Sequence, residues 1–198
     1  MKKNEPTIEE VKKFYNDEHT KHQQKWLTKH NPRITALRDW ATVQAMKYSP
    51  ATMLDIGCGV GILTHEMAGM IPQITAIDLS DSNIESAKEH KSHKRITYLC
   101  GDFTRMSYNI PYDMVCAFDV IEHIRPSDRE NFLLNARVHC KGVMLVSIPN
   151  PELILSLRKT NPDLLQIVDE TVYDKDFGMF TILKKLSVGK YIYYILKP

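Results

Sequence analysis

The sequence contains no long hydrophobic run, few cysteines and no strong excess of charge of either sign. No apolar stretch approaches the ~20 residues that a transmembrane helix needs, and the N-terminus leads into a charged segment rather than a secretory signal. The four cysteines form no CxxC pair, so we expect reduced packing residues, with neither a disulfide nor a metal centre. The net charge of +2 is too small to indicate nucleic-acid binding. We therefore expect a cytoplasmic protein that has no membrane span and no nucleic-acid partner.

Internal repeats, low-complexity tracts and Pro/Gly/Ser-rich linkers are also absent, which favours a single domain for the 198 residues. The spacing of apolar residues predicts two helices, over 7–29 with Thr7 as the N-cap and over 33–47, separated by an Asn-Pro break. Residues 1–47 are thus expected to form a helical prefix. Residues 48–198 are expected to form an α/β core.

In this core, strand and helix patterns alternate, which predicts a largely parallel sheet with crossover helices. The expected strands cover residues 53–56, 74–78, 96–100, 112–118 and 143–148, and the expected helices cover 61–69, 81–90 and 127–139. A short loop or turn is predicted over 104–111 and a mixed insertion over 151–170. Two final strands are predicted over 177–184 and 190–197.

The most informative motif is the run Leu-Asp-Ile-Gly-Cys-Gly-Val-Gly over residues 54–61, which follows a strand and opens a helix. Glycines allow a ligand to lie against bare backbone, and the helix N-terminus behind the turn presents unpaired N–H groups. This arrangement indicates a nucleotide-binding fold, although the spacing is GxGxG rather than the GxGxxG of dinucleotide binders. Asp78, at the end of the next strand and 19 residues after Gly59, is placed to accept both hydroxyls of a ribose.

The ends of the later strands carry further motifs. One strand ends in Gly101-Asp102-Phe103, where a carboxylate beside an aromatic ring can accept from an adenine amino group and cover its ring. The runs LDIGCGVG, AIDLS, GDF, FDVIEHI and SIPN, in this order, resemble the class I S-adenosylmethionine (SAM)-dependent methyltransferases. They look most like the ubiquinone-biosynthesis-type branch, which acts on small molecules. The resemblance covers about residues 50–150.

The resemblance implies an α/β fold with a doubly wound, Rossmann-like, seven-stranded sheet of order 3-2-1-4-5-7-6, an antiparallel last strand and an N-terminal helical lid. It implies an enzyme that transfers a methyl group from SAM to an O, N or C nucleophile of a small-molecule metabolite, with S-adenosylhomocysteine as product. A SAM-binding subunit or regulator without catalysis, and an NAD(P)-dependent oxidoreductase, are the alternatives. No Asn-Pro-Pro-Tyr, Asp-Pro-Pro-Tyr or Pro-Cys motif follows the fourth strand, which favours a small-molecule acceptor.

The resemblance also assigns residues to the cofactor, and several assignments have a structural alternative. Asp55 would orient the turn and the ammonium group of SAM, or would only anchor the loop. Asp78 would hold the ribose, or would cap the following helix. Arg33 would pair with the SAM carboxylate, or would be a surface arginine. The other expected cofactor-binding residues are Gly57 and Gly59 at the methionine tail, Leu79, Asp102 and Phe103 at the adenine, and Phe118 at the sulfonium end.

On the acceptor side, His123 is the candidate general base for a hydroxyl nucleophile, because imidazole titrates near neutral pH. The alternative is that the Glu-His pair to which it belongs positions a loop. Tyr15 and His19 of the predicted lid, and Asn150 after the fifth strand, are candidate acceptor-binding residues. His19 and His22 are spaced to share a metal, but no acidic cluster accompanies them, so we expect no metal site.

Overall fold

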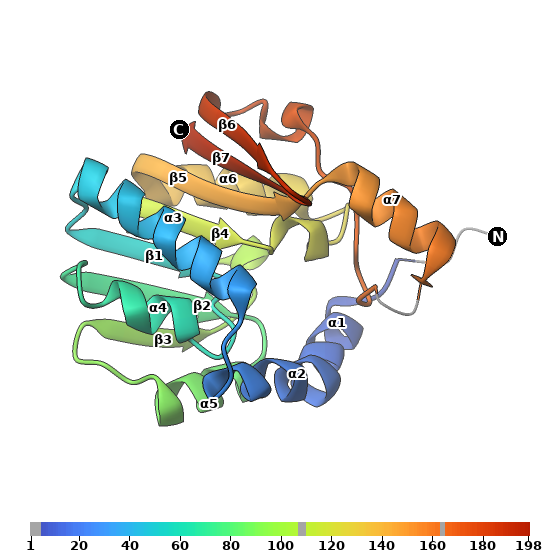
Figure 1. Cartoon of the computed structure of the whole chain (residues 1–198), viewed down its shortest axis with the longest axis horizontal. Helices are drawn as coiled ribbons and strands as arrows, with labels where there is room; N and C mark the ends of the chain where they lie inside the picture. The colour runs from blue at the N-terminus through green and yellow to red at the C-terminus, as the bar shows by residue number, and fades with distance from the viewer. Residues whose placement is uncertain (1–4, 107–109, 163–164) are drawn as a thin grey trace.

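A seven-stranded sheet of order β3-β2-β1-β4-β5-β7-β6 forms the centre of the computed structural model, which describes residues 5–106, 110–162 and 165–198 (Figure 1). The strands are β1 (Thr52–Ile56), β2 (Gln73–Asp78), β3 (Ile96–Cys100), β4 (Tyr112–Phe118), β5 (Cys140–Pro149), β6 (Thr181–Val188) and β7 (Tyr191–Lys197). The first five are parallel, and β7 is antiparallel to both of its neighbours. The predicted strand order and the antiparallel last strand are confirmed.

Helices cover both faces of this sheet (Figure 1). The helices α3 (Pro32–Tyr48), α4 (Ile62–Met67) and α5 (Asp81–His90) lie on one face, and α6 (Arg129–His139) lies on the other. Because successive strand residues point to opposite faces, Met53 packs in a buried cluster with α3 and α4, whereas Leu54 packs in a cluster with α6. None of the helices in the described ranges is long and apolar enough to cross a bilayer.

One predicted strand differs from the structure, and the structure defines two segments that were predicted only loosely. The strand expected from residue 177 begins only at Thr181, because Phe177 belongs to a 3-10 turn and packs in the core with its ring 4.7 Å from that of Tyr194. The predicted mixed insertion opens with a regular helix, α7 (Pro151–Thr160), whose proline stands in the first turn. The loop expected over 104–111 begins with a 3-10 turn ending at Arg105, and its residues 107–109 lie outside the described ranges.

The cysteines are also less uniformly buried than expected. Cys116 and Cys140 are buried in the sheet region, as packing residues should be. Cys58 is half-buried in the glycine turn, and Cys100 is exposed at the end of β3, where its thiol donates to Asp81.

The predicted helical prefix divides into two parts. Helix α3 packs into the sheet through Ala41 and Ala45, so it is a layer of the domain rather than a cover. Residues 8–27, here called the N-terminal segment, lie across the carboxyl ends of the strands instead (Figure 1). Only this part occupies the position expected of a lid.

The N-terminal segment is not the single helix predicted over 7–29. It consists of α1 (Ile8–Phe14), a π-helical turn (Tyr15–His19), α2 (Thr20–Gln24) and a 3-10 turn (Lys25–Leu27). Thr7 caps α1 as expected. Its hydroxyl accepts from the N–H of Glu10, and the Glu10 carboxylate accepts from the N–H of Thr7. At the π-helical turn, the buried hydroxyl of Thr20 lies 2.7 Å from the carbonyl oxygen of Tyr15. Such a widened turn interrupts the regular helical spacing on which the prediction depended.

Candidate active site

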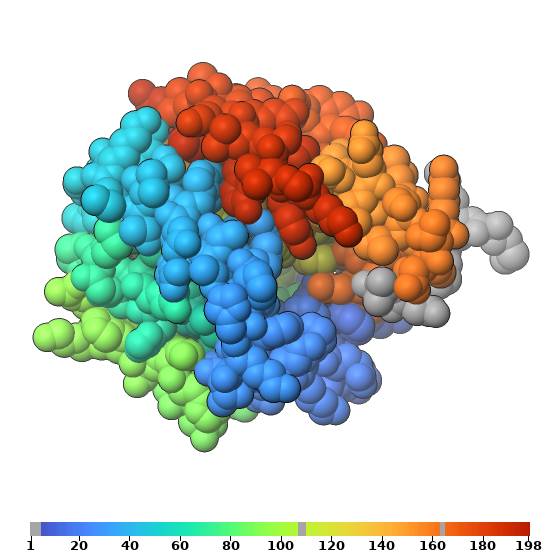
Figure 2. Space-filling model, viewed as in Figure 1, coloured from blue at the N-terminus to red at the C-terminus, as the bar shows by residue number. Residues whose placement is uncertain are grey.

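A cavity of about 370 Å³ opens at the carboxyl ends of β1, β2 and β4, the edge at which open α/β sheets bind ligands. In the space-filling view, a recess lies between the N-terminal segment, α7 and the C-terminal strands (Figure 2). The expected site residues that line the cavity are Tyr15, His19, Arg33, Asp55, Gly57, Gly59, Asp78, Leu79, Asp102, Phe103, Phe118 and His123. The structure does not bring Asn150 to this cavity; Asn150 caps α7 by accepting from the N–H of Leu153 at 2.8 Å.

In the glycine turn, the backbone conformation itself requires glycine. Gly57, Gly59 and Gly61 have φ angles of +74°, +54° and +76°, a region that residues with a Cβ rarely adopt. A Cβ on Gly59 would also lie 2.1 Å from Oε1 of Gln23, which accepts from the N–H of Val60 at 3.2 Å. The carboxamide of Gln23, from the N-terminal segment, therefore lies directly on the turn.

Asp78 connects the end of β2 to the glycine turn. Its buried carboxylate accepts from the N–H groups of Gly59 at 2.8 Å and Ser80 at 2.9 Å, and from the side-chain amide of Asn83 at 3.0 Å. Burial raises the pKa of Asp78, and these donors oppose the increase. Ser80, not Asp78, is the N-cap of α5. The interpretation of Asp78 as a helix cap is therefore wrong.

Two further carboxylates line the cavity at different strand ends. Asp55 accepts from the Thr64 hydroxyl at 2.5 Å, and burial raises its pKa to about 6. Asp102 uses Oδ1 to accept from the N–H and hydroxyl of Thr104 at 2.9 and 2.7 Å. Its buried Oδ2 receives no hydrogen bond from the described residues, with Nε of Arg105 at 3.4 Å. In the described part of the chain, one oxygen of Asp102 thus accepts no hydrogen bond and has only the ion pair with Arg105.

The neighbouring apolar candidates differ in exposure. Phe103 is buried, with its ring centroid 5.5 Å from that of Phe132 on α6. Leu79 and Phe118 are half-buried at the cavity wall. Only the two half-buried side chains retain surface that a ligand ring can cover.

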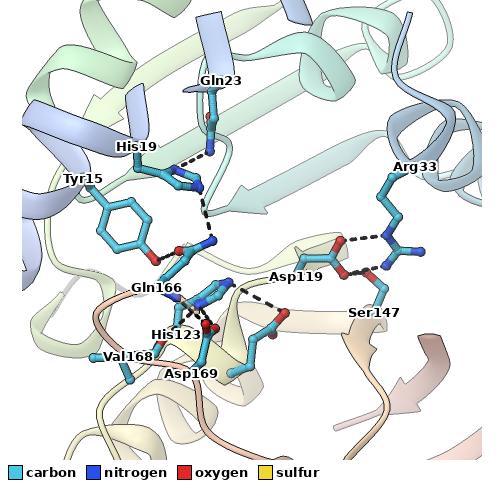
Figure 3. A network of polar contacts seen from close by, with 11 residues as sticks. Tyr15, His19, Gln23, Arg33, Asp119, His123, Ser147, Gln166, Val168 and Asp169 are labelled. Atoms are coloured by element: carbon cyan, nitrogen blue, oxygen red, sulfur yellow. Dashed lines mark hydrogen bonds and ion pairs between the residues drawn. The ribbon is translucent and has the colours of Figure 1, made fainter. Parts of the chain in front are cut away.

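Arg33 is not a surface residue, and in this structure its guanidinium is engaged by other side chains. Its guanidinium forms a two-pronged ion pair with Asp119, at 2.8 and 2.5 Å (Figure 3). The same guanidinium donates to the hydroxyl of Tyr193 at 2.6 Å. It also stacks on the ring of Tyr191, 3.5 Å from the centroid. Asp119 has a positive φ of 55° and accepts a further hydrogen bond from Ser147 at 2.8 Å. Arg33 thus fastens the start of α3 to the end of β4.

His123 lies in a short turn after β4, and its side chain is 16% exposed. Nδ1 is 2.8 Å from Oδ1 of Asp169 and 2.8 Å from the carbonyl oxygen of Val168. Burial would lower the pKa of His123, but the hydrogen bond to Asp169 and the charges of Glu122 and Asp169 outweigh burial and raise it to about 9. Glu122 is itself buried, which raises its pKa to about 8. At neutral pH His123 is therefore an imidazolium.

The N-terminal segment meets this turn through a chain of polar contacts (Figure 3). The Tyr15 hydroxyl donates to Oε1 of Gln166 at 2.7 Å, and the amide nitrogen of Gln166 lies 3.2 Å from Nε2 of His19. Nδ1 of His19 is in turn 3.0 Å from the amide nitrogen of Gln23. Burial, followed by the charge of His123, lowers the pKa of His19 to about 4, so its ring is neutral. The ring of Tyr15 thus lies between those of His19 and His123, with centroids 5.0 and 6.4 Å away.

Three residues of this network were not indicated by the sequence. Gln166 and Asp169 lie in an irregular segment after α7, where no motif surrounds them. Gln23 stands four residues after His19, a spacing that places two side chains on the same helix face, and this is the only signal that pointed to it. In the ranges that the structure describes, no group of three or more His, Cys, Asp or Glu side chains is arranged to hold a metal ion.

Comparison with known proteins agrees with this geometry. Residues 53–142 match the family described as a methyltransferase domain. A ubiquinone biosynthesis O-methyltransferase from Bradyrhizobium sp. is 36% identical over 136 residues, which are 63% of this chain and 53% of the relative. A mitochondrial enzyme of the same name from Schizosaccharomyces pombe is 32% identical over 115 residues, 56% of this chain and 42% of the relative. The chain thus spans about half the length of these curated relatives.

Solved structures show the same fold over nearly the whole chain. Magnesium protoporphyrin IX methyltransferase from Synechocystis, with S-adenosylhomocysteine bound, superposes with a TM-score of 0.74 at 16% identity, covering 96% of this chain and 97% of that one. The N-methyltransferase NodS from Bradyrhizobium japonicum, also with S-adenosylhomocysteine, gives a TM-score of 0.69 at 14% identity and covers 96% of each chain.

The strand order, the glycine turn and the acid at the end of β2 define a Rossmann-like domain of the methyltransferase type. With the family match over residues 53–142, this domain is similar to the class I SAM-dependent methyltransferases.

Proposed function

We propose that this protein transfers the methyl group of SAM to a hydroxyl oxygen of a small-molecule acceptor. The observation that carries the proposal is the pairing of His123 with Asp169 beside the cavity, which provides a proton acceptor at the end of β4. The names of the curated relatives, which are O-methyltransferases, support oxygen over nitrogen or carbon as the nucleophile.

The residues around the cavity fit SAM as the methyl donor. Oδ2 of Asp102, which accepts no hydrogen bond from the described residues, would accept from the amino group of adenine. The glycine turn would take the methionine tail in the space beside Gly59 that the Gln23 carboxamide fills in this structure. Asp78 would hold the ribose hydroxyls. When bound, SAM would supply a methyl group activated by its sulfonium. The protein then has to orient the acceptor and remove its proton.

His123 has one ring nitrogen available for that proton. Asp169 and Val168 occupy Nδ1, whereas Nε2 makes no hydrogen bond within the described residues and has only Glu122 at 3.9 Å. SAM would supply the methyl group and its sulfur would leave with the S–C electron pair, while Nε2 of His123 would take the proton of the acceptor hydroxyl. Because the pKa of His123 is about 9, the ring must first lose its own proton. We therefore expect the rate of methyl transfer to rise with pH up to about 9.

The test combines binding with transfer. Isothermal titration with SAM, S-adenosylhomocysteine and NAD identifies the cofactor, and deuterated-methyl SAM followed by mass spectrometry identifies the methylated acceptor. The first acceptors should be phenols, since a base with a pKa near 9 is matched to a hydroxyl of pKa about 10. Alcohols and amines follow. Label found on nitrogen or carbon would overturn the choice of oxygen. Heat from NAD but none from SAM would overturn the proposal as a whole.

A further inference from the structure

The 166–169 loop joins two parts of the cavity that the fold otherwise keeps apart. It follows α7 and lies outside the residues that match the methyltransferase family. From this one short loop, Asp169 and Val168 contact His123, while Gln166 contacts Tyr15 and His19 of the N-terminal segment (Figure 3).

Asp169 ties the loop to the turn after β4. Its side chain is only 7% exposed, and Oδ1 lies 2.8 Å from Nδ1 of His123. Its other oxygen accepts from the N–H of Gln166 at 2.5 Å. One carboxylate therefore holds both the imidazole and the backbone from which the Gln166 side chain projects.

Gln166 ties the same loop to the N-terminal segment. Its side chain lies between the Tyr15 hydroxyl at 2.7 Å and Nε2 of His19 at 3.2 Å. Tyr15 is buried, which raises the pKa of its phenol well above 10, and His19 is neutral, so the contacts on this side of the loop carry no charge. Neutral hydrogen bonds of this kind are weak, which suits a contact that has to open and close.

We propose that the 166–169 loop is a latch in which Asp169 positions His123 and Gln166 holds the N-terminal segment closed. Closure over the acceptor and orientation of the proton-accepting ring are then a single event. Asp169 is a positioning residue, because it acts on the acceptor only through His123. The inference rests on the proposed function, in which His123 receives the acceptor proton.

The positioning role of Asp169 is tested with Asp169→Asn, which keeps an oxygen for Nδ1 of His123 but removes the negative charge. The groups facing His123 are Asp169 from the loop, Glu122 from its own turn, and Tyr15 and His19 from the N-terminal segment. An opposite charge at this distance shifts a pKa by roughly one to three units. We expect the NMR titration midpoint of the His123 ring to fall by at least about one unit from its value near 9.

The same variant is then followed by its pH–rate profile. The rate plateau should begin at a correspondingly lower pH, while the affinity for S-adenosylhomocysteine stays within about twofold of wild type. Asp39→Asn, an exposed change on α3, is the matched control. An unchanged NMR midpoint would overturn the positioning role of Asp169. A shifted midpoint with an unshifted rate profile would keep the pairing and overturn His123 as the proton acceptor.

The Gln166 half is tested by amide hydrogen exchange with Gln166→Ala. Loss of the latch should speed exchange across the N-terminal segment severalfold and raise the KM for the acceptor more than it lowers kcat. Gln73→Ala, an exposed change at the start of β2, should alter neither quantity. Exchange rates in the N-terminal segment that match those of the Gln73 variant would overturn the latch.

Discussion

At the scale of single residues, Asp78 and Asp102 line the same cavity but differ in their hydrogen-bond partners. Asp78 accepts from Gly59, Ser80 and Asn83, whereas Asp102 has an oxygen that accepts no hydrogen bond from the described residues. The difference follows from local geometry. Asp78 ends a strand beside the glycine turn, where N–H groups are plentiful, while Asp102 meets only the donors of the following residues.

Replacing Asp78 with Ala should weaken binding of S-adenosylhomocysteine at least tenfold. The change removes acceptors for the ribose hydroxyls, and hydrogen bonds to a charged group are worth about 1.5–3 kcal/mol each. Because Asp78 also holds the glycine turn through Gly59, the melting temperature must be measured beside the titration. Asp39→Ala is the control on an exposed helix face. Normal affinity in a folded Asp78 variant would remove this residue from the cofactor site.

Glu122 should make stability depend on pH. Its pKa is about 8 in the folded protein against an ordinary 4.5, because its side chain is buried. Between these values the folded state keeps a proton that the unfolded chain has lost, so the free energy of unfolding falls as pH rises. Glu122→Gln removes this loss. The stability gain of the variant over wild type should therefore grow from pH 5 to 8 in urea unfolding.

The control for that measurement is Glu89→Gln, at a side chain that is 74% exposed. It should show the same pH dependence as wild type. Parallel curves for Glu122→Gln and wild type would mean that Glu122 is already charged in the folded protein at neutral pH.

At the scale of elements, the N-terminal segment is held by polar contacts rather than by a core of its own. Only Val11 among its apolar side chains is buried. Thr20 lies 2.7 Å from Asn83 of α5, and Lys12 pairs with Asp81 at 2.7 Å. Helices this short depend on such packing for stability. We therefore expect the N-terminal segment to open at a lower cost in free energy than α3.

S-adenosylhomocysteine should slow amide exchange across the N-terminal segment and leave α3 unchanged. The physical reason is that the segment lies over the cavity, whereas α3 is already buried against the sheet. Deleting residues 1–30 should likewise lower methyl transfer far more than it lowers the melting temperature. Equal exchange with and without ligand, or a deletion that unfolds the domain, would show that the segment is structural.

At the scale of the whole molecule, residues far apart in the sequence form one cavity. The contact between Gln166 and His19 joins residues 147 positions apart, and that between Arg33 and Asp119 joins residues 86 apart. The C-terminal strands contribute too, since Tyr191 and Tyr193 of β7 hold the Arg33 guanidinium. An antiparallel β7 brings these two tyrosines beside the ends of β4 and β5.

The sequence by itself determined the parallel core, the glycine turn and the placement of Asp78 and His123. These depend on local patterns: apolar runs define strands, φ angles above zero demand glycine, and polar residues at parallel strand ends meet at one edge. Only the tertiary structure decided the partners. The ion pair of Arg33 with Asp119 and the contacts of Gln166 and Asp169 link segments with no common period or motif. Such contacts depend on how a whole chain packs, so the sequence around each partner could not reveal them.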